Sequence, residues 1–221
     1  MTLPRDDVSK GLIAELDNME QLLRSIDDDA WNTPSRCEGW TVAGVASHAV
    51  GGIADVVNGK LDGLGTPEAT QREVDERAGR SPAELADEVA TIRKQAADML
   101  TIFDDDAWQA PAPGGYAGTL GDGVEALWFD LYAHGDDIRN ALGQPSERGD
   151  GLRPTISHIA TELTKRGWGP ATLALDGLPA FPVGDGTGER IYGDPLQFML
   201  VATGRASAAS MGLDNDVNIY G

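Results

Sequence analysis

Apolar residues recur at three- and four-residue steps over four long stretches of the first 145 residues, and this spacing predicts four amphipathic helices. The first stretch covers residues 7–26, where Val8, Leu12, Leu16, Met19, Leu23 and Ile26 form one apolar stripe. The other three stretches cover residues 42–61, 82–103 and 120–142. Four helices of this length, with a long connection between the second and third, are typical of a four-helix bundle.

Capping and stop signals support these boundaries. Ser81, Pro82 and Glu84 combine a serine cap, a first-turn proline and a capping-box glutamate, which predicts a helix start. Thr119 and Asp122 resemble a weaker capping box. Residues 62–80 are polar and contain three glycines and a proline, so we expect a long connection that allows a short helical turn.

The pair Gly51 and Gly52 weakens the second predicted helix, because each glycine costs about 1 kcal/mol relative to alanine. We expect glycine there because another helix, or a ligand, comes close to the backbone.

The pattern changes after residue 150. We predict a helix over 152–167, a strand over 171–175, a turn-rich stretch over 177–188 and a short helix over 194–203. The predicted fold is therefore mainly α: a four-helix bundle in a domain of residues 1–147, followed by a small α/β C-terminal segment, residues 148–221. A segment of that size has a marginal core of its own, so we expect it to dock on the bundle.

Composition excludes several classes of function. The formal net charge of −19, without a run of basic residues, disfavours binding to nucleic acid or to an anionic membrane. No apolar run approaches the roughly 20 residues of a membrane-spanning helix. Cys37 is the single cysteine, so there is no internal disulfide, and we expect a reducing, cytoplasmic setting. A nucleophilic role for Cys37 is not favoured.

Three histidines occur in the chain, and two of them suggest a metal site. Asp130 and His134 are four residues apart and would share one helix face. His48 lies in the second predicted helix. Two imidazoles and one carboxylate make a three-ligand site that leaves a position for water or substrate. The alternatives are an ordinary polar pair on α-helical spacing and a histidine that is satisfied in the core.

Two further acidic residues, Asp137 and Glu125, lie on the same predicted helix as Asp130 and His134. Asp137 follows on the same stripe and would either orient an imidazole from behind or lie as an ordinary carboxylate in the last helical turns. Glu125 would point to the opposite side, which makes Asp130 the better ligand.

Two motifs resemble those of a known family. Cys37-Glu38-Gly39-Trp40-Thr41-Val42, followed by His48, resembles the N-terminal motif of the mycothiol-dependent maleylpyruvate isomerase family, whose bundle is that of DinB-like metalloproteins. Asp130-Leu131-Tyr132-Ala133-His134-Gly135-Asp136-Asp137 resembles its later motif. The resemblance covers residues 7–145. Many members have glutamate where this chain has Asp130, which leaves the identity of the metal open.

The resemblance implies a DinB-like bundle in which His48, Asp130 and His134 hold a divalent metal, zinc above all. It implies mycothiol as the thiol cosubstrate and a small electrophile as the other partner, with isomerisation or S-transfer as the reaction. Ala202-Thr203-Gly204-Arg205 resembles a recurrent element of the family, and Arg205 would be a catalytic residue that binds a carboxylate. The alternative for Arg205 is a cation that stabilises a helix C-terminus.

Two other functions stay open at this point: a non-catalytic metal-binding or stress-response protein, and a metal-dependent hydrolase with Asp137 or Glu38 as the base. Arginine outnumbers lysine 13 to 4, a bias expected of a high-GC genome and hence of an actinobacterium, where mycothiol occurs.

Overall fold

The computed structural model describes residues 3–221 and divides into two compact units, Pro4–Glu147 and Arg148–Gly221, the second including Leu3. Among the described residues, no helix is long and apolar enough to cross a membrane. That the two units are independent domains stays a prediction.

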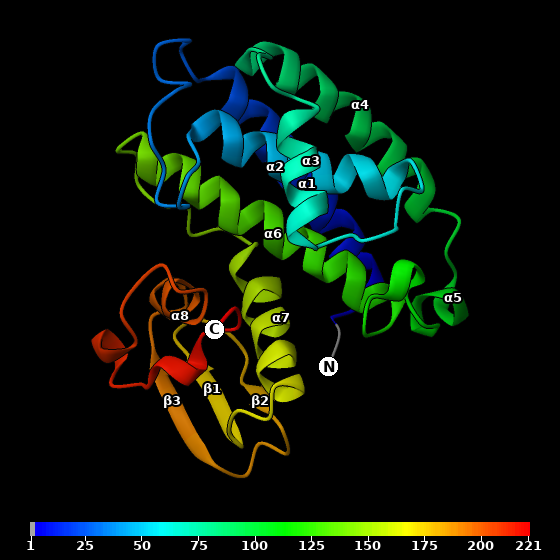
Figure 1. The fold of residues 1–221 in the computed structure, drawn as a ribbon. Helices are drawn as coiled ribbons and strands as arrows, with labels where there is room; N and C mark the ends of the chain where they lie inside the picture. The colour runs from blue at the N-terminus through cyan, green and yellow to red at the C-terminus, as the bar shows by residue number, and fades with distance from the viewer. Residues whose placement is uncertain (1–2) are drawn as a thin grey trace. The chain divides into compact units, whose positions relative to one another are not determined.

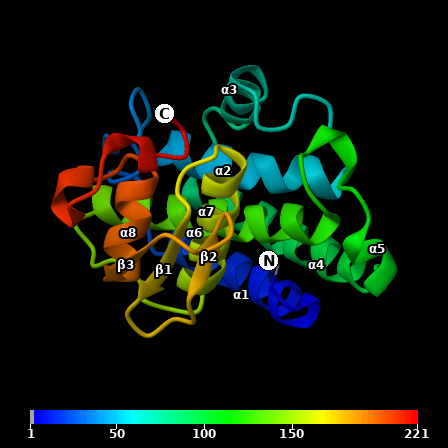
Figure 2. The ribbon, with the colours of Figure 1, turned by 90° about the horizontal axis from the view of Figure 1, so that it is seen from below.

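The first unit is helical, as the periodicity predicts (Figure 1). Its helices are α1 (Arg5–Arg24), α2 (Val42–Val57), α3 (Pro67–Asp75), α4 (Pro82–Leu100), α5 (Asp105–Gln109) and α6 (Leu120–Ala141), with a 3₁₀ turn at Pro113–Gly115. Helix α1 packs on α4 and α6, and α2 packs on the same two helices, so that these four form the bundle. Helix α3 packs on the outer side of α2 (Figure 2).

The helix starts follow from their caps. The Ser81 hydroxyl accepts from the backbone N–H of Glu84, whose carboxylate accepts from the Ser81 N–H, so the predicted capping box is confirmed. Thr119 and Asp122 make the same reciprocal pair at the start of α6. Thr41 caps α2 through the N–H of Gly44. The caps at Thr41 and Thr119 fix the first turns of α2 and α6, the helices that carry the candidate ligands.

Helix α3 is longer than the single turn that the sequence allowed. Thr66 caps it, and Pro67 occupies its first turn. It lies close to α2 at Gly51, where an added Cβ would be 2.6 Å from the Cβ of Glu73. The expectation that a helix approaches this glycine pair is therefore confirmed at Gly51, whereas a Cβ at Gly52 would meet nothing within 4 Å.

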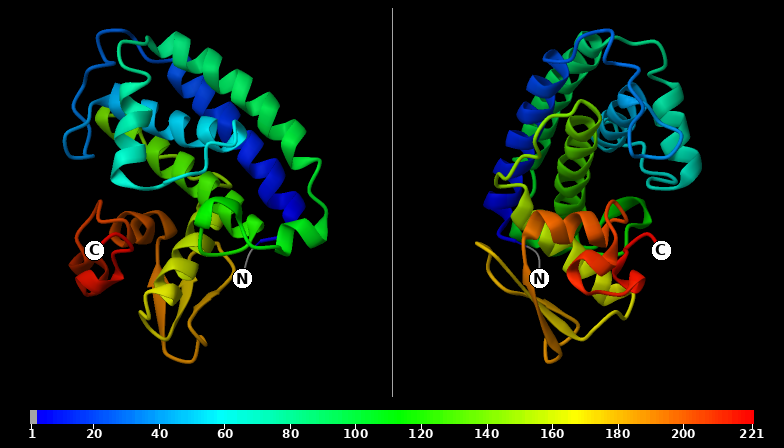
Figure 3. Two further views of the ribbon diagram at one scale, coloured as in Figure 1. Left: turned by 45° about the vertical axis from the view of Figure 1, so that its right-hand side comes forward. Right: turned by 90° about the vertical axis from the view of Figure 1, so that its left-hand side faces the viewer.

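The second unit contains a three-stranded sheet that the sequence predicted only in part (Figure 3). Its elements are α7 (Leu152–Lys165), β1 (Ala171–Leu175), β2 (Phe181–Val183), β3 (Glu189–Gly193) and α8 (Pro195–Ala202), followed by 3₁₀ turns at Ala208–Met211 and Asn215–Val217. Strand β1 is central, antiparallel to β2 and parallel to β3. Helix α7 packs on β2 and α8.

Candidate metal centre

Helices α2 and α6 bring His48 and His134 together. Their ring centroids are 5.0 Å apart and the rings are nearly perpendicular, at 82°. One ligand atom from each of His48, Asp130 and His134 lies within 4.8 Å of the other two. The Nε2 atom of His134 is 3.5 Å from Oδ1 of Asp130. Two ligands held at about 2.1 Å by a tetrahedral zinc ion are roughly 3.4 Å apart, so this spacing fits such an ion.

The Nδ1 atom of each imidazole is paired with a buried carboxylate. Nδ1 of His48 lies 2.7 Å from Oε2 of Glu73, and Nδ1 of His134 lies 2.8 Å from Oδ2 of Asp137. An Nδ1–H that donates to a carboxylate leaves the lone pair on Nε2, which is the arrangement of metal-binding histidines in proteins. Both rings are therefore prepared to bind a cation through Nε2.

Asp137 is fully buried and accepts three hydrogen bonds. Besides His134, the Nε of Arg36 donates to Oδ1 at 2.5 Å and the thiol of Cys37 donates to Oδ2 at 3.2 Å. Arg36 also donates to buried Asp136 at 2.6 Å, which ties the loop before α2 to α6. Asp137 was expected either to orient an imidazole or to be an ordinary carboxylate in the last helical turns. Its hydrogen bond with Nδ1 of His134 supports the first alternative.

Cys37, His134 and Asp137 form a second group of potential ligands. A cation held by this group would lie against the guanidinium of Arg36, which already neutralises Asp137. It would also replace the Nδ1–H that His134 donates to Asp137. The chemistry therefore favours the group of His48, Asp130 and His134.

The surroundings of the two rings are acidic. Glu73, Asp136 and Asp137 are buried, Asp130 is about one-third exposed, and Arg36 pairs with Asp136 and Asp137. Buried carboxylates are costly unless positive charge compensates them. A divalent cation would supply that charge.

His134 is the residue most affected by these charges. Burial alone would lower the pKa of its imidazole, but the charge of Asp130 and hydrogen bonds with Asp130, Asp137 and Cys37 raise that pKa well above its usual value. The surroundings of His134 therefore favour positive charge on its imidazole. A metal ion has to compete with a proton for the imidazole nitrogen.

Trp40 borders the site from the loop before α2. Its ring centroid is 5.3 Å from that of His48, and its backbone carbonyl accepts from the N–H of Ser35.

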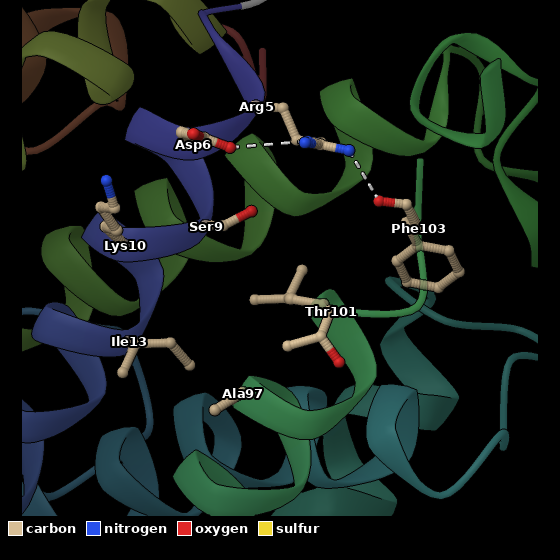
Figure 4. A pocket seen from close by; sticks show the side chains of 9 residues that line it. Arg5, Asp6, Ser9, Lys10, Ile13, Ala97, Thr101 and Phe103 are labelled. Atoms are coloured by element: carbon tan, nitrogen blue, oxygen red, sulfur yellow. Dashed lines mark hydrogen bonds and ion pairs between the residues drawn. The ribbon is translucent and has the colours of Figure 1, made fainter. Parts of the chain in front are cut away.

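Two surface cavities of about 420 and 470 Å³ lie elsewhere in this unit and are lined by none of the candidate ligands. The first is formed by α1 and the end of α4, beside the hydrogen bond from Arg5 to the carbonyl of Phe103 (Figure 4).

Comparison with known proteins identifies the family of this chain. A family model described as the mycothiol maleylpyruvate isomerase N-terminal domain matches residues 12–139, which is more than half of the chain and includes all three candidate ligands. The chain belongs to this family. No protein of curated function matches the sequence.

Two solved structures share the family's fold with this chain. A histidine-to-alanine variant of a mycothiol-dependent maleylpyruvate isomerase matches with a TM-score of 0.64 and 19% identity, over 96% of each chain. A second structure of a mycothiol-dependent maleylpyruvate isomerase matches with a TM-score of 0.62 and 20% identity, over 93% of this chain and 91% of that one. The DinB-like fold followed by a small mixed segment is thereby confirmed.

Sequence reasoning missed Glu73, because residues 62–80 were assigned to a connection. The signal that could have found it is the Thr66-Pro67 start, which predicts a helix on which Ala69 and Glu73 share a face.

Arg205 lies in the C-terminal unit, where its Nη1 is 3.5 Å from the carbonyl of Thr203. Its catalytic role stays a prediction.

Proposed function

We propose that this protein is a metal-dependent enzyme that uses a low-molecular-weight thiol, mycothiol by family membership, to act on a small electrophile. The observation that carries the proposal is the convergence of His48, Asp130 and His134, with each Nδ1 held by a buried carboxylate. Nitrogen and oxygen donors of this kind suit zinc. The single cysteine, Cys37, fits the reducing cytoplasm as the setting.

The residues of the centre have separate tasks in this proposal. Glu73 and Asp137 would hold the Nδ1 protons, so that the Nε2 lone pair of each ring is left for the ion. Asp130, the most exposed of the three candidate ligands, lies where solvent and a cosubstrate can enter. A divalent ion bound there would lower the pKa of a thiol that coordinates to it.

Isomerisation is the reaction that the family name favours. The thiol sulfur would add to an activated double bond of the substrate, the resulting single bond would rotate, and elimination would release the thiol together with the isomer. If the adduct left unchanged, the protein would be an S-transferase. Hydrolysis is less well supported, because Asp137, one of its two candidate bases beside Glu38, is fully buried and already accepts three hydrogen bonds.

The decisive experiment tests for a thiol at the metal. We expect the cobalt(II)-substituted protein to show an absorption spectrum that changes when mycothiol or another low-molecular-weight thiol is added, since a sulfur ligand alters the cobalt spectrum. An alcohol of similar size is the control and should leave the spectrum unchanged. A cobalt spectrum that no thiol perturbs would instead favour a non-catalytic metal-binding protein.

We also propose that Arg205 binds a carboxylate of the substrate or thiol. Its planar guanidinium suits that task, and the alternative is a purely structural cation after α8. Arg205→Ala is expected to retain bound metal and to lose turnover. The exposed arginine Arg190, which stacks on Tyr192 in β3 of the same unit, provides the matched control Arg190→Ala. Unchanged kinetics of Arg205→Ala with an active substrate would reject the assignment.

A further inference from the structure

Glu73 is a buried carboxylate that comes from outside the four-helix bundle. It lies on α3, and 1% of its surface is exposed. Its Oε2 is 2.7 Å from Nδ1 of His48, a distance typical of a charge-assisted hydrogen bond. A buried carboxylate lowers stability unless a donor satisfies it, so its placement against His48 calls for a reason beyond packing.

Helix α3 is held so that Glu73 has little freedom to move. Arg77 donates to the backbone carbonyl of Glu73 at 3.1 Å and, through two nitrogens, to Glu88 of α4 at 2.6 and 3.2 Å. Arg72 pairs with buried Asp55 of α2. The helix is therefore tied to α2 on one side and to α4 on the other.

Gly51 sets the distance between α2 and α3. A Cβ at this position would be 2.6 Å from the Cβ of Glu73 and 2.8 Å from Nη1 of Arg77. Any side chain there would push α3 outward and draw the carboxylate of Glu73 away from His48, which precedes Gly51 by one helical turn. Gly52, the next residue, faces open space and imposes no such limit.

We propose that Glu73 is a positioning residue of the metal centre: it accepts the Nδ1–H of His48 and thereby fixes the tautomer and the orientation that direct Nε2 at the ion. The inference rests on the proposed metal centre and extends it to α3. Asp137 has the corresponding position behind His134, but it shares its charge with Arg36 and Cys37. The two histidines are thus oriented by carboxylates from different elements.

The test compares Glu73→Gln with Glu68→Gln, which removes the same charge from an exposed position of the same helix. Affinity for zinc and cobalt is measured by competition with a chromophoric chelator. Glu73→Gln is expected to bind about 10–100-fold more weakly, as is usual when the partner of a metal-bound histidine is lost. Its cobalt spectrum should also change, a readout that a merely structural residue would not move. Glu68→Gln should match the wild type in both.

Two outcomes separate this inference from the proposed function. Wild-type protein that binds neither cobalt nor zinc would overturn both. Wild-type protein that binds cobalt, together with a Glu73→Gln variant of unchanged affinity and spectrum, would overturn the role of Glu73 alone.

A second pair of variants tests the same inference without changing any charged residue. Gly51→Ala is expected to weaken metal affinity by displacing α3, whereas Gly52→Ala should retain it, although both changes favour the helical state locally. Circular dichroism of the metal-free proteins verifies that each variant is folded. Full metal affinity in folded Gly51→Ala protein would contradict the inference.

Discussion

His134→Ala is expected to abolish stoichiometric binding of zinc or cobalt, and His48→Ala is expected to do the same. Each change removes one of the three groups that converge between α2 and α6 and leaves its buried carboxylate, Asp137 or Glu73, without the imidazole. Loss of a direct ligand should exceed the roughly 10–100-fold loss of affinity that follows removal of an outer partner. Metal content after dialysis and isothermal titration of the metal-free protein measure the effect.

The third histidine provides the control. His158 lies on α7 in the C-terminal unit, so His158→Ala makes the same chemical change outside the candidate centre. It should retain one metal ion per chain. Full metal content in both His48→Ala and His134→Ala would contradict the assignment of the ligands.

Asp130 is an aspartate where the family resemblance led us to expect a glutamate. Its Oδ1 already lies 3.5 Å from Nε2 of the histidine one turn later, so the shorter side chain reaches the centre from the same helix. The i,i+4 spacing on α6 was therefore sufficient to predict this pair from the sequence. The position of His48 against it needed only that two amphipathic helices pack face to face.

The partners of the two Nδ1 atoms were harder to predict, for different physical reasons. Asp137 was visible on the same helix face, but helical spacing does not show whether a carboxylate contacts a ring or solvent. Glu73 was missed, because α3 has only nine residues, few of them apolar, among glycine-rich loops. Its place depends on the close approach of α3 to Gly51. The glycine pair indicated that a helix or a ligand comes close, but not which segment of the chain does so.

The C-terminal unit was predicted less completely. The strand predicted over 171–175 is present as β1. Strands β2 and β3 are short and flanked by turns, and they exist because they pair with β1 on either side. Pairing partners distant in sequence decide such strands more than their own residues do.

Another buried acid, Glu15, lies between α1 and α6. Glu15 of α1 is 5% exposed, and its Oε2 accepts from the indole N–H of Trp128 on α6 at 3.3 Å. Helices α1 and α6 approach closely here, because a Cβ at Gly11 would be 1.8 Å from the ring of Trp128. Burial, and then the charge of nearby Glu147, raise the pKa of Glu15 to about 7, although Trp128 and Arg139 oppose the shift.

This raised pKa makes the stability of the protein depend on pH. The pKa of Glu15 is about 7 in the folded protein, against an ordinary value of 4.5, so between these pH values the folded state binds a proton that the unfolded state releases. The contribution of Glu15 is therefore most favourable below pH 4.5, declines as the pH rises and is lost above about pH 7. A shift of this size corresponds to up to about 3 kcal/mol.

Glu15→Gln is expected to remove this pH dependence, because the amide carbonyl can still accept from Trp128 but carries no charge. The variant should be more stable than the wild type at pH 8, by up to about 3 kcal/mol, and the difference should shrink as the pH falls towards 5. Urea unfolding followed by tryptophan fluorescence at several pH values measures the free energy of unfolding. Glu68→Gln, an exposed acid on α3, is the matched control and should follow the wild type. The prediction would be contradicted if the free energy of unfolding of Glu15→Gln fell between pH 5 and 8 as steeply as that of the wild type. In that case a group other than Glu15 would account for the pH dependence of stability.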